Sequence, residues 1–512
     1  MSEAASVLRV SEKTLGQLAR EGKVPSQRVG REWRFLRWAL GQWLTGQEAA
    51  GSTSETAQEQ PASPAPSAIR ASADGQTING CRDTAFTQNR GEALHRWVPW
   101  IAGFSASFVE GVFDSALHGP PREVTVLDPF AGVGTTLVEG LKRGYNVVGF
   151  EINPYAALAC RAKLLVYDYN VGLLKGRIAA FSEFMARAAR DQNMLPLSEP
   201  PAGFVSRTPF FSPVVERKVL FVLDFIAGEQ EAWLADLFRV ALGAQMVAFS
   251  NYTYEPSLGS RRAAGKPDID EADVAGMIAG KLSEMAEDIL SVQEQLGAYD
   301  YRPQARLFDE SCLNQRCDLD RTVDLVVTSP PYLNNYHYLR NTRPQLHWLN
   351  LVDSNGTQRH LEETSFGKYW QTVRNGPPVE LGFDYPELAE AIETLRRVNV
   401  DRGAYGGPGW ANYAATYFND CLLFCQSIGR MMKPEGLMVV VIGNNILQGL
   451  EFPTDVHFAK IAEKAGFETI NLHVVRRKRT GSSIINSSAR VGTVAKRVQL
   501  YETAVELRWR GL

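Results

Sequence analysis

Continuous apolar runs alternate along the chain with stretches in which apolar residues are spaced three and four positions apart. The continuous runs predict buried strands at 124–128, 146–150, 306–309, 323–327 and 436–442, with further strands near 468–475 and 498–508. The three-and-four spacing predicts helices between the strands, most clearly over 216–248 and 272–296. Strands that alternate with helices indicate an α/β fold with a mainly parallel sheet, in which ligands bind at the carboxyl ends of the strands.

The first 46 residues form a separate pattern. Helical spacing over 12–21 is followed at 27–35 by an alternation that predicts a hairpin. Basic residues gather on this hairpin, which favours a nucleic-acid-binding unit over a small protein-interaction module. Residues 47–79 are rich in Ser, Ala, Thr, Gln, Gly and Pro and predict a flexible linker, so that 80–512 form the larger domain.

A Thr-Ser-Pro-Pro-Tyr sequence at 328–332 follows one of the predicted buried strands. Pro330 and Pro331 have fixed φ angles and no N–H, so the carbonyls here point in set directions without a competing local donor. Ser329 adds a small polar group and Tyr332 an aromatic face. This set suits a planar base that carries an exocyclic amine, although Pro-Pro alone is more typical of a turn that ends a strand.

A second motif begins at Asp128, where another predicted strand ends. Gly132 and Gly134 follow, and a helix is expected directly after them. Glycines let backbone approach a ligand closely, and a helix start offers free N–H groups, although a lone glycine turn is also an ordinary strand-to-helix corner. The next strand ends at Glu151, about 20 positions further on, where nucleotide-binding folds hold ribose hydroxyls. The short Gly-x-Gly spacing favours S-adenosylmethionine over NAD.

Together the two motifs resemble those of the DNA amino-methyltransferases, and the resemblance covers most of the chain from about residue 80 onward. It implies a Rossmann-like methyltransferase sheet, S-adenosylmethionine as cofactor and Ser329, Pro330, Pro331 and Tyr332 as catalytic residues. Serine in the first catalytic position is common among enzymes that make N4-methylcytosine, whereas adenine enzymes usually carry Asp or Asn. The cofactor-binding residues that the resemblance implies are Asp128, Phe130, Gly132, Gly134, Thr135, Glu151, Asn153 and Asp309. Asp309 is equally suited to capping a helix.

The N-terminal unit is similar to excisionase-type winged helix-turn-helix domains, in which a Val-Ser-x-x-Thr-Leu helix precedes a Gly-Arg-x-Trp-Arg-Phe wing. The resemblance implies two sets of DNA contacts. The residues expected to face a groove are Lys13, Thr14 and Gln17, and those expected to meet phosphates are Arg28, Arg31 and Arg34.

Two long regions of the larger domain are candidates for target recognition. Residues 170–300 are mostly helical by pattern and too long for a simple connection. Residues 333–412 are polar, aromatic and loop-rich. Basic residues that either bind DNA phosphates or lie on solvated loops are Arg261, Arg262, Arg476, Arg477 and Lys478.

Composition limits which cellular compartment and which binding partners we expect for this protein. The 512-residue chain has a net charge of −3, so any nucleic-acid contact must come from local basic patches. No apolar run is long enough to span a bilayer and no signal-peptide core precedes the first domain, so we expect a cytoplasmic protein without membrane contact. The six cysteines are scattered without a Cys-x-x-Cys pair, so no metal site or disulfide framework is expected.

The resemblance implies a site-specific enzyme that methylates cytosine N4 in double-stranded DNA, in a restriction-modification or defence system with cognate partner proteins. Three alternatives remain from the sequence. In the first, the enzyme methylates N6 of adenine; in the second, the substrate is RNA. In the third, the protein is a non-catalytic DNA-binding regulator that keeps the fold.

Overall fold

The structure is a computed structural model of the chain, and it divides into two compact units, Met1–Ala68 and Ile69–Leu512. The residues that it describes are 14, 15, 19, 24, 27–29, 32–34, 86–100, 103–254, 257–314, 316–333, 338–477 and 500–511. The predicted linker at 47–79 lies outside them.

The predicted hairpin of the first unit is confirmed. Strands β1 (Gln27–Val29) and β2 (Glu32–Arg34) pair antiparallel, with Val29 opposite Glu32. Thr14 lies exposed in helical backbone. Arg28 and Arg34 belong to the two strands, whereas Lys13, Gln17 and Arg31 lie outside the described residues.

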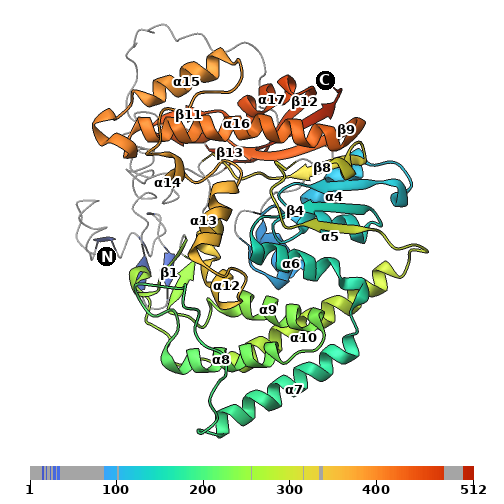
Figure 1. The fold of residues 1–512 in the computed structure, drawn as a ribbon, viewed down its shortest axis with the longest axis vertical. Coiled ribbons are helices and arrows are strands. Elements are labelled where there is room, and N and C mark those ends of the chain that lie inside the picture. Colours follow the sequence, from blue (N-terminus) through green and yellow to red (C-terminus); the bar gives the residue numbers. More distant parts are fainter. Residues whose placement is uncertain are drawn as a thin grey trace. The chain divides into compact units, whose positions relative to one another are not determined.

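A seven-stranded sheet organises the second unit (Figure 1). Its spatial order is β12 (Phe467–Arg477), β13 (Tyr501–Trp509), β9 (Met432–Gly443), β8 (Val323–Thr328), β3 (Thr125–Asp128), β4 (Asn146–Phe150) and β7 (Ala305–Phe308). The five strands from β9 to β7 are parallel, and β13 runs antiparallel between β9 and β12. The chain moves outward from β3 to β7 and then returns to β8 beside β3. This switch point places the carboxyl ends of β3 and β8 side by side, as the fold class predicted.

Helices cover both faces of the sheet, which explains why the strands read as continuous apolar runs. Val126 and Leu127 are both 0% exposed although they point to opposite faces. On one face Val126 packs with α4 (Ala106–Ala116), and on the other Leu127 packs with α16 (Gly407–Met431). The helix expected after the glycine turn is α5 (Thr135–Lys142). Helix α17 (Thr454–Lys464) follows β9 after the short strands β10 (Asn445–Leu447) and β11 (Leu450–Phe452).

The region 170–300 is helical, as predicted. Its helices are α7 (Val171–Arg190), α8 (Pro213–Ala227), α9 (Ala232–Gln245) and α10 (Val274–Leu296). They pack together and against α6 (Pro154–Leu164), which follows β4, and Figure 1 shows them as a layer beside the sheet. A short hairpin of β5 (Tyr252–Tyr254) and β6 (Leu258–Ser260) joins α9 to α10.

The expectation of a loop-rich region at 333–412 was wrong, because much of the described part is helical. Its helices are α11 (Tyr338–Asn341), α12 (Arg343–Trp348), α13 (Asn355–Thr364), α14 (Trp370–Val373) and α15 (Pro386–Arg396). Most are too short to show a repeating apolar pattern. The glycine-rich stretch before 412 opens α16, where a Cβ on Gly407 would lie 1.9 Å from the Leu395 carbonyl oxygen.

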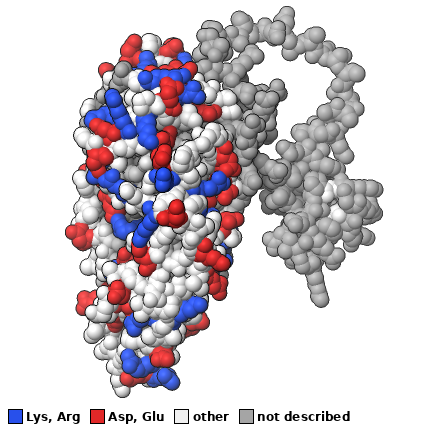
Figure 2. All heavy atoms as spheres, turned by 90° about the vertical axis from the view of Figure 1, so that its right-hand side faces the viewer, with Lys and Arg blue, Asp and Glu red and all other residues white. Residues whose placement is uncertain are grey.

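Charges of both signs are interspersed over the face of the molecule that Figure 2 draws. This mixture fits the net charge of −3. Among the described residues, no helix is long and apolar enough to cross a membrane.

Candidate active site

A hydrogen bond joins the ends of the two strands that carry the motifs. Thr328 Oγ1 donates to Asp128 Oδ1 at 2.6 Å, and the Phe130 N–H donates to the same oxygen at 3.0 Å. Asp128 is 1% exposed, and its burial raises the pKa of the carboxyl to about 6. The predicted cofactor residue Asp128 therefore also ties the glycine turn to the catalytic strand.

The two glycines of the turn have different surroundings. Gly134 has φ +88°, and a Cβ there would lie 2.8 Å from Cys160 Sγ, so this glycine allows α5 to pack against α6. Gly132 has φ +53° and faces a cavity, where a Cβ would lie 3.4 Å from Trp100 Nε1. Gly132 is thus the glycine that leaves room for a ligand.

Glu151 is held by the backbone on both sides. Its Oε2 accepts from the Gly132 N–H and its Oε1 from the Asn153 N–H, each at 2.7 Å. Burial raises the pKa of Glu151 to about 7, and nearby Asp128 acts in the same direction. Asn153 caps α6 and donates from Nδ2 to Thr342 Oγ1 at 2.9 Å. Glu151 therefore faces the cavity, whereas Asn153 fixes the helix beside it.

The cavity has a volume of about 1060 Å³ and brings both motifs together. The predicted residues that line it are Asp128, Phe130, Gly132, Thr135, Glu151, Ser329 and Pro331. Those that do not line it are Gly134, Asn153, Asp309, Pro330 and Tyr332. The functional roles of these residues stay predictions, but the structure gathers most of them at one place.

Asp309 is the clearest departure from the expected site. Its carboxylate pairs with the Arg161 guanidinium and is 54% exposed, outside the cavity. Glu310 and Ser311, the next two residues, line the cavity instead. Strand β7 ends at Phe308, and near a strand end successive side chains point in opposite directions. The sequence pattern located the strand end but not which side chain faces inward.

Ser329 and Tyr332 are oriented by strand β9. The Ser329 hydroxyl donates to the Val441 carbonyl oxygen at 3.0 Å and lines the cavity. The Tyr332 ring packs beside Gly443, where a Cβ would lie 3.4 Å from the ring, and burial raises the pKa of its hydroxyl. Ser329 thus lines the cavity, whereas the partly buried Tyr332 ring packs beside it against β9, and the catalytic roles of both stay predictions.

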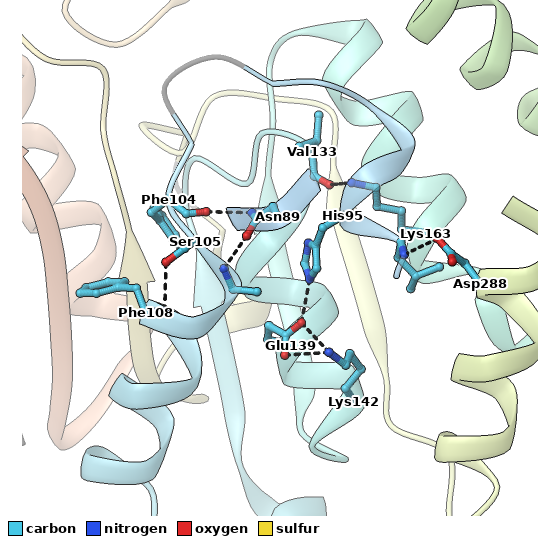
Figure 3. Close-up of polar contacts among 12 residues, drawn as sticks. Asn89, His95, Phe104, Ser105, Phe108, Val133, Glu139, Lys142, Lys163 and Asp288 are labelled. Atoms are coloured by element: carbon cyan, nitrogen blue, oxygen red, sulfur yellow. Dashed lines mark hydrogen bonds and ion pairs between the residues drawn. The ribbon is translucent and has the colours of Figure 1, made fainter. Parts of the chain in front are cut away.

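Buried polar residues that sequence reasoning missed hold one wall of the cavity. Figure 3 shows His95 pointing to Glu139 on α5, with 2.7 Å between Nε2 and Oε1. Asp288 on α10 accepts from the Leu94 N–H at 2.9 Å and from Trp97 Nε1 at 3.0 Å. The same segment continues to Trp100, which lines the cavity and stacks on Tyr338 with ring centroids 6.2 Å apart. A carboxylate within the apolar pattern of 272–296 was the available signal for Asp288.

Four of the basic residues expected to bind DNA, Arg261, Arg262, Arg476 and Arg477, do not line the cavity. Arg261 Nε donates to the Pro267 carbonyl oxygen at 2.7 Å, and Arg262 pairs with Asp268 at 2.6 Å. Arg476 and Arg477 end β12, and Lys478 is outside the described residues. Their contact with DNA stays a prediction.

Known proteins resemble this chain in its first residues and over most of its length. Residues 1–48 match the helix-turn-helix domain family. The chain is 23% identical over 455 residues to the type II methyltransferase M.BsoBI of Geobacillus stearothermophilus, covering 81% of this chain and 86% of that protein. It is 22% identical over 425 residues to the type II methyltransferase M.AvaI of Anabaena variabilis, covering 80% and 85%. The chain is similar to the type II methyltransferases over most of its length.

The similarity to type II methyltransferases is not confined to the two motifs, because each alignment spans most of both chains. The type II methyltransferase M.MvaI of Kocuria varians is 22% identical over 394 residues, covering 73% of this chain and 82% of that protein. Among solved structures, the rRNA methyltransferase aviRa of Streptomyces viridochromogenes has a TM-score of 0.30 and 10% identity, with 85% of this chain and 96% of that one covered. The motifs and the type II methyltransferase homology fit the amino-methyltransferase class.

Proposed function

We propose that this protein is a DNA methyltransferase that transfers the methyl group of S-adenosylmethionine to the exocyclic amine of cytosine, giving N4-methylcytosine in a restriction-modification or defence system. The observation that carries the proposal is that Ser329 and the Gly132 turn line one cavity, with Thr328 and Asp128 joining their strands at 2.6 Å. The homology to type II methyltransferases supports DNA as the substrate.

The residues around the glycine turn fit a nucleoside cofactor. The Glu151 carboxylate faces the cavity at the end of β4, where it can accept hydrogen bonds from ribose hydroxyls. Gly132 leaves space for backbone to approach the ligand, and Phe130 gives an apolar wall. When bound, S-adenosylmethionine supplies an electrophilic methyl group. The volume of about 1060 Å³ lies at the upper end of the range of about 300–1,000 Å³ that is typical of ligand pockets.

The proposed role of Ser329 is to prepare the amine. The lone pair of a cytosine exocyclic nitrogen is conjugated with the ring, so this nitrogen is a poor nucleophile. The Ser329 hydroxyl donates to Val441, which leaves its oxygen able to accept from the amine. A hydrogen bond from an amine proton to Ser329 Oγ would draw the lone pair out of conjugation. The resemblance implies a second such bond to the Pro330 carbonyl, although Pro330 does not line the cavity. Positioning and preorganised electrostatics then accelerate the transfer.

The target cytosine must leave the duplex to reach this cavity. In the proposed role Tyr332 stacks on the base, and its ring is partly buried beside Gly443. Cytosine is favoured over adenine because the resemblance places serine where adenine enzymes carry Asp or Asn. A regulator without activity is disfavoured because residues of both motifs line one cavity.

The N-terminal unit supports DNA over RNA as the substrate. Its match to a helix-turn-helix domain covers residues 1–48. In the proposed role, Lys13, Thr14 and Gln17 face a groove while the basic hairpin meets phosphates.

The test is methyl transfer by the full-length protein. Labelled S-adenosylmethionine is incubated with unmodified genomic DNA and, separately, with total RNA. We expect label in duplex DNA and none in RNA. Gly132→Val is the matched inactive control, because a side chain there would fill the ligand space at a φ of +53°, and calorimetry should show no cofactor binding. Label in RNA alone, or cofactor binding without transfer to any nucleic acid, would contradict the proposal.

A further inference from the structure

We propose that α13 reads the base pairs that flank the target base, with Gln358 and Arg359 as specificity-determining side chains. The inference rests on the proposed function, because it requires that a base of a DNA duplex enters the cavity.

Helix α13 has a polar surface that packing does not require. Ser354 caps it by accepting from the Thr357 N–H at 3.2 Å, and none of its described side chains is buried. Leu361 alone among them packs against a hydrophobic core, and only partly. The long helices of the second unit, by contrast, each bury an apolar face. Because this surface helix buries so little apolar area, its side chains are available for contacts with a ligand.

The position of α13 puts it beside the reacting groups. Gln358, Arg359, Glu362 and Glu363 line the same cavity as Ser329. The side chains of Arg359 and Glu363 are 78% and 49% exposed, so they lie where the cavity opens to solvent. Figure 1 shows α13 standing between the helical layer and the elements around α16. A flipped base enters through this opening while its neighbours stay stacked, so the edges of those neighbours come within reach of α13.

The side chains present are those that read bases. Arginine pairs with guanine O6 and N7, glutamine with adenine N6 and N7, and glutamate accepts from cytosine N4. Arg359 Nε donates to Glu363 Oε1 at 3.0 Å, and Gln358 Nε2 donates to Glu362 Oε1 at 3.0 Å. Both are pairs between residues four positions apart on one helix, and the exposed Arg359–Glu363 pair contributes little stability. Arg359 can therefore exchange this pair for a contact with a base at little cost. Gln358 is half-buried, and its Oε1 also lies 3.4 Å from His347 Nε2.

The helical insertion is the weaker candidate for this role. Arg262 is paired with Asp268 in its own loop, and Arg261 bonds to Pro267. Neither arginine lines the cavity. Because α13 lines the cavity and these arginines do not, α13 is the better candidate for recognising the bases next to the target base.

The experiment compares methylation profiles over a library of duplexes with randomised flanks around the target. Arg359→Ala is the test variant, and Gln358→Ala is the second. Arg397→Ala is the matched control, because Arg397 is also 78% exposed and paired with a glutamate four positions away, Glu393, but lies outside the cavity. We expect Arg359→Ala to relax the preference at a flanking position by about 5- to 150-fold, the discrimination typical of one bidentate base contact. Cofactor affinity and melting temperature should stay unchanged, and Arg397→Ala should keep the wild-type profile.

Two results separate the possible failures. Active enzyme whose profile is the same in wild type, Arg359→Ala and Gln358→Ala overturns the role of α13 and leaves the proposed function intact. Wild-type protein that methylates no duplex overturns the proposed function itself.

Discussion

The buried ammonium of Lys163 donates a hydrogen bond to the carbonyl oxygen of Val133 at 2.7 Å, inside the glycine turn (Figure 3). Lys163 is 0% exposed, and burial lowers the pKa of its amine to about 8. Val133 lies between Gly132 and Gly134, so this bond fixes the turn from behind through α6. The cavity wall therefore depends on a lysine that contacts no ligand.

Lys163→Met should weaken the turn while keeping the length of the side chain. It leaves the Val133 carbonyl without its donor, and an unsatisfied buried polar group costs about 1–3 kcal/mol. We expect a lower free energy of unfolding by that amount, together with weaker binding of S-adenosylmethionine in calorimetry. Lys175→Met, at an exposed position on α7, is the control and should change neither. Wild-type cofactor affinity in Lys163→Met would show that the turn holds its shape without this bond.

Asp288→Asn should loosen the segment that ends at Trp100. The substitution keeps the size of the side chain but removes the charge that pairs with Arg96, where Arg96 Nη2 lies 2.6 Å from Oδ1. Loss of hydrogen bonds to a buried charged group costs about 1.5–3 kcal/mol, measurable by urea unfolding. Cofactor affinity should fall as well, because Trp100 forms part of the cavity wall. Glu294→Gln, at an exposed position on the same helix, should leave both quantities unchanged. Equal cofactor affinity in both variants would separate the segment from the site.

Binding of S-adenosylmethionine should strengthen as the pH rises through about 7. The pKa of Glu151 is raised to about 7 by burial, and its ionised form is the better acceptor for ribose hydroxyls. Because hydrogen bonds to charged groups exceed neutral ones by about 1 kcal/mol, we expect about a fivefold gain in affinity between pH 6 and pH 8. Glu151→Gln should bind more weakly and lose most of this pH dependence. A wild-type affinity independent of pH would contradict the role of the carboxylate.

In the cofactor-free protein, the contribution of Glu151 to stability should fall as the pH rises, whereas the affinity for the cofactor increases. Between the unfolded pKa of 4.5 and the folded value of about 7, the folded state holds more protons on Glu151 than the unfolded state. The contribution of Glu151 to stability is therefore full below pH 4.5 and is lost as the pH rises through 7. The difference in melting temperature between wild type and Glu151→Gln, followed from pH 4.5 to pH 7, measures this contribution of Glu151.

Deleting residues 1–46 should weaken DNA binding without affecting the cofactor site. The removed unit carries the basic hairpin, so fewer phosphates are contacted and the salt dependence of DNA affinity should become shallower. Fluorescence anisotropy at several salt concentrations measures both the affinity and the slope. An unchanged affinity and slope would indicate that the unit binds a protein instead.

The strands and the two motifs were predictable because apolar runs report burial directly. The strand at 323–327 and the serine after it share one short stretch, so sequence alone places Ser329 at a strand end. Which of Asp309 and Glu310 faces inward depends on how the chain leaves β7, and no local pattern encodes that.

The supports of the cavity were not predictable for a different reason. Lys163 and Asp288 are of residue types usually found at the surface and His95 of an intermediate type, and their burial depends on partners far along the chain. Asp288 meets Leu94 across 194 positions, and Lys163 meets Val133 across 30. Helices α11, α12 and α14 were missed because each has too few residues to show a period, and α13 because its polar sequence shows no apolar face.

The most direct test of the account is mass spectrometry of nucleosides from DNA methylated with labelled S-adenosylmethionine. We predict label on N4-methyldeoxycytidine. In Ser329→Ala the rate should fall about 100- to 1,000-fold, the typical effect of losing one preorganised hydrogen bond, while calorimetry shows unchanged cofactor affinity. Label on N6-methyldeoxyadenosine alone, or full activity in Ser329→Ala, would contradict the assignment of Ser329 as the residue that prepares a cytosine amine.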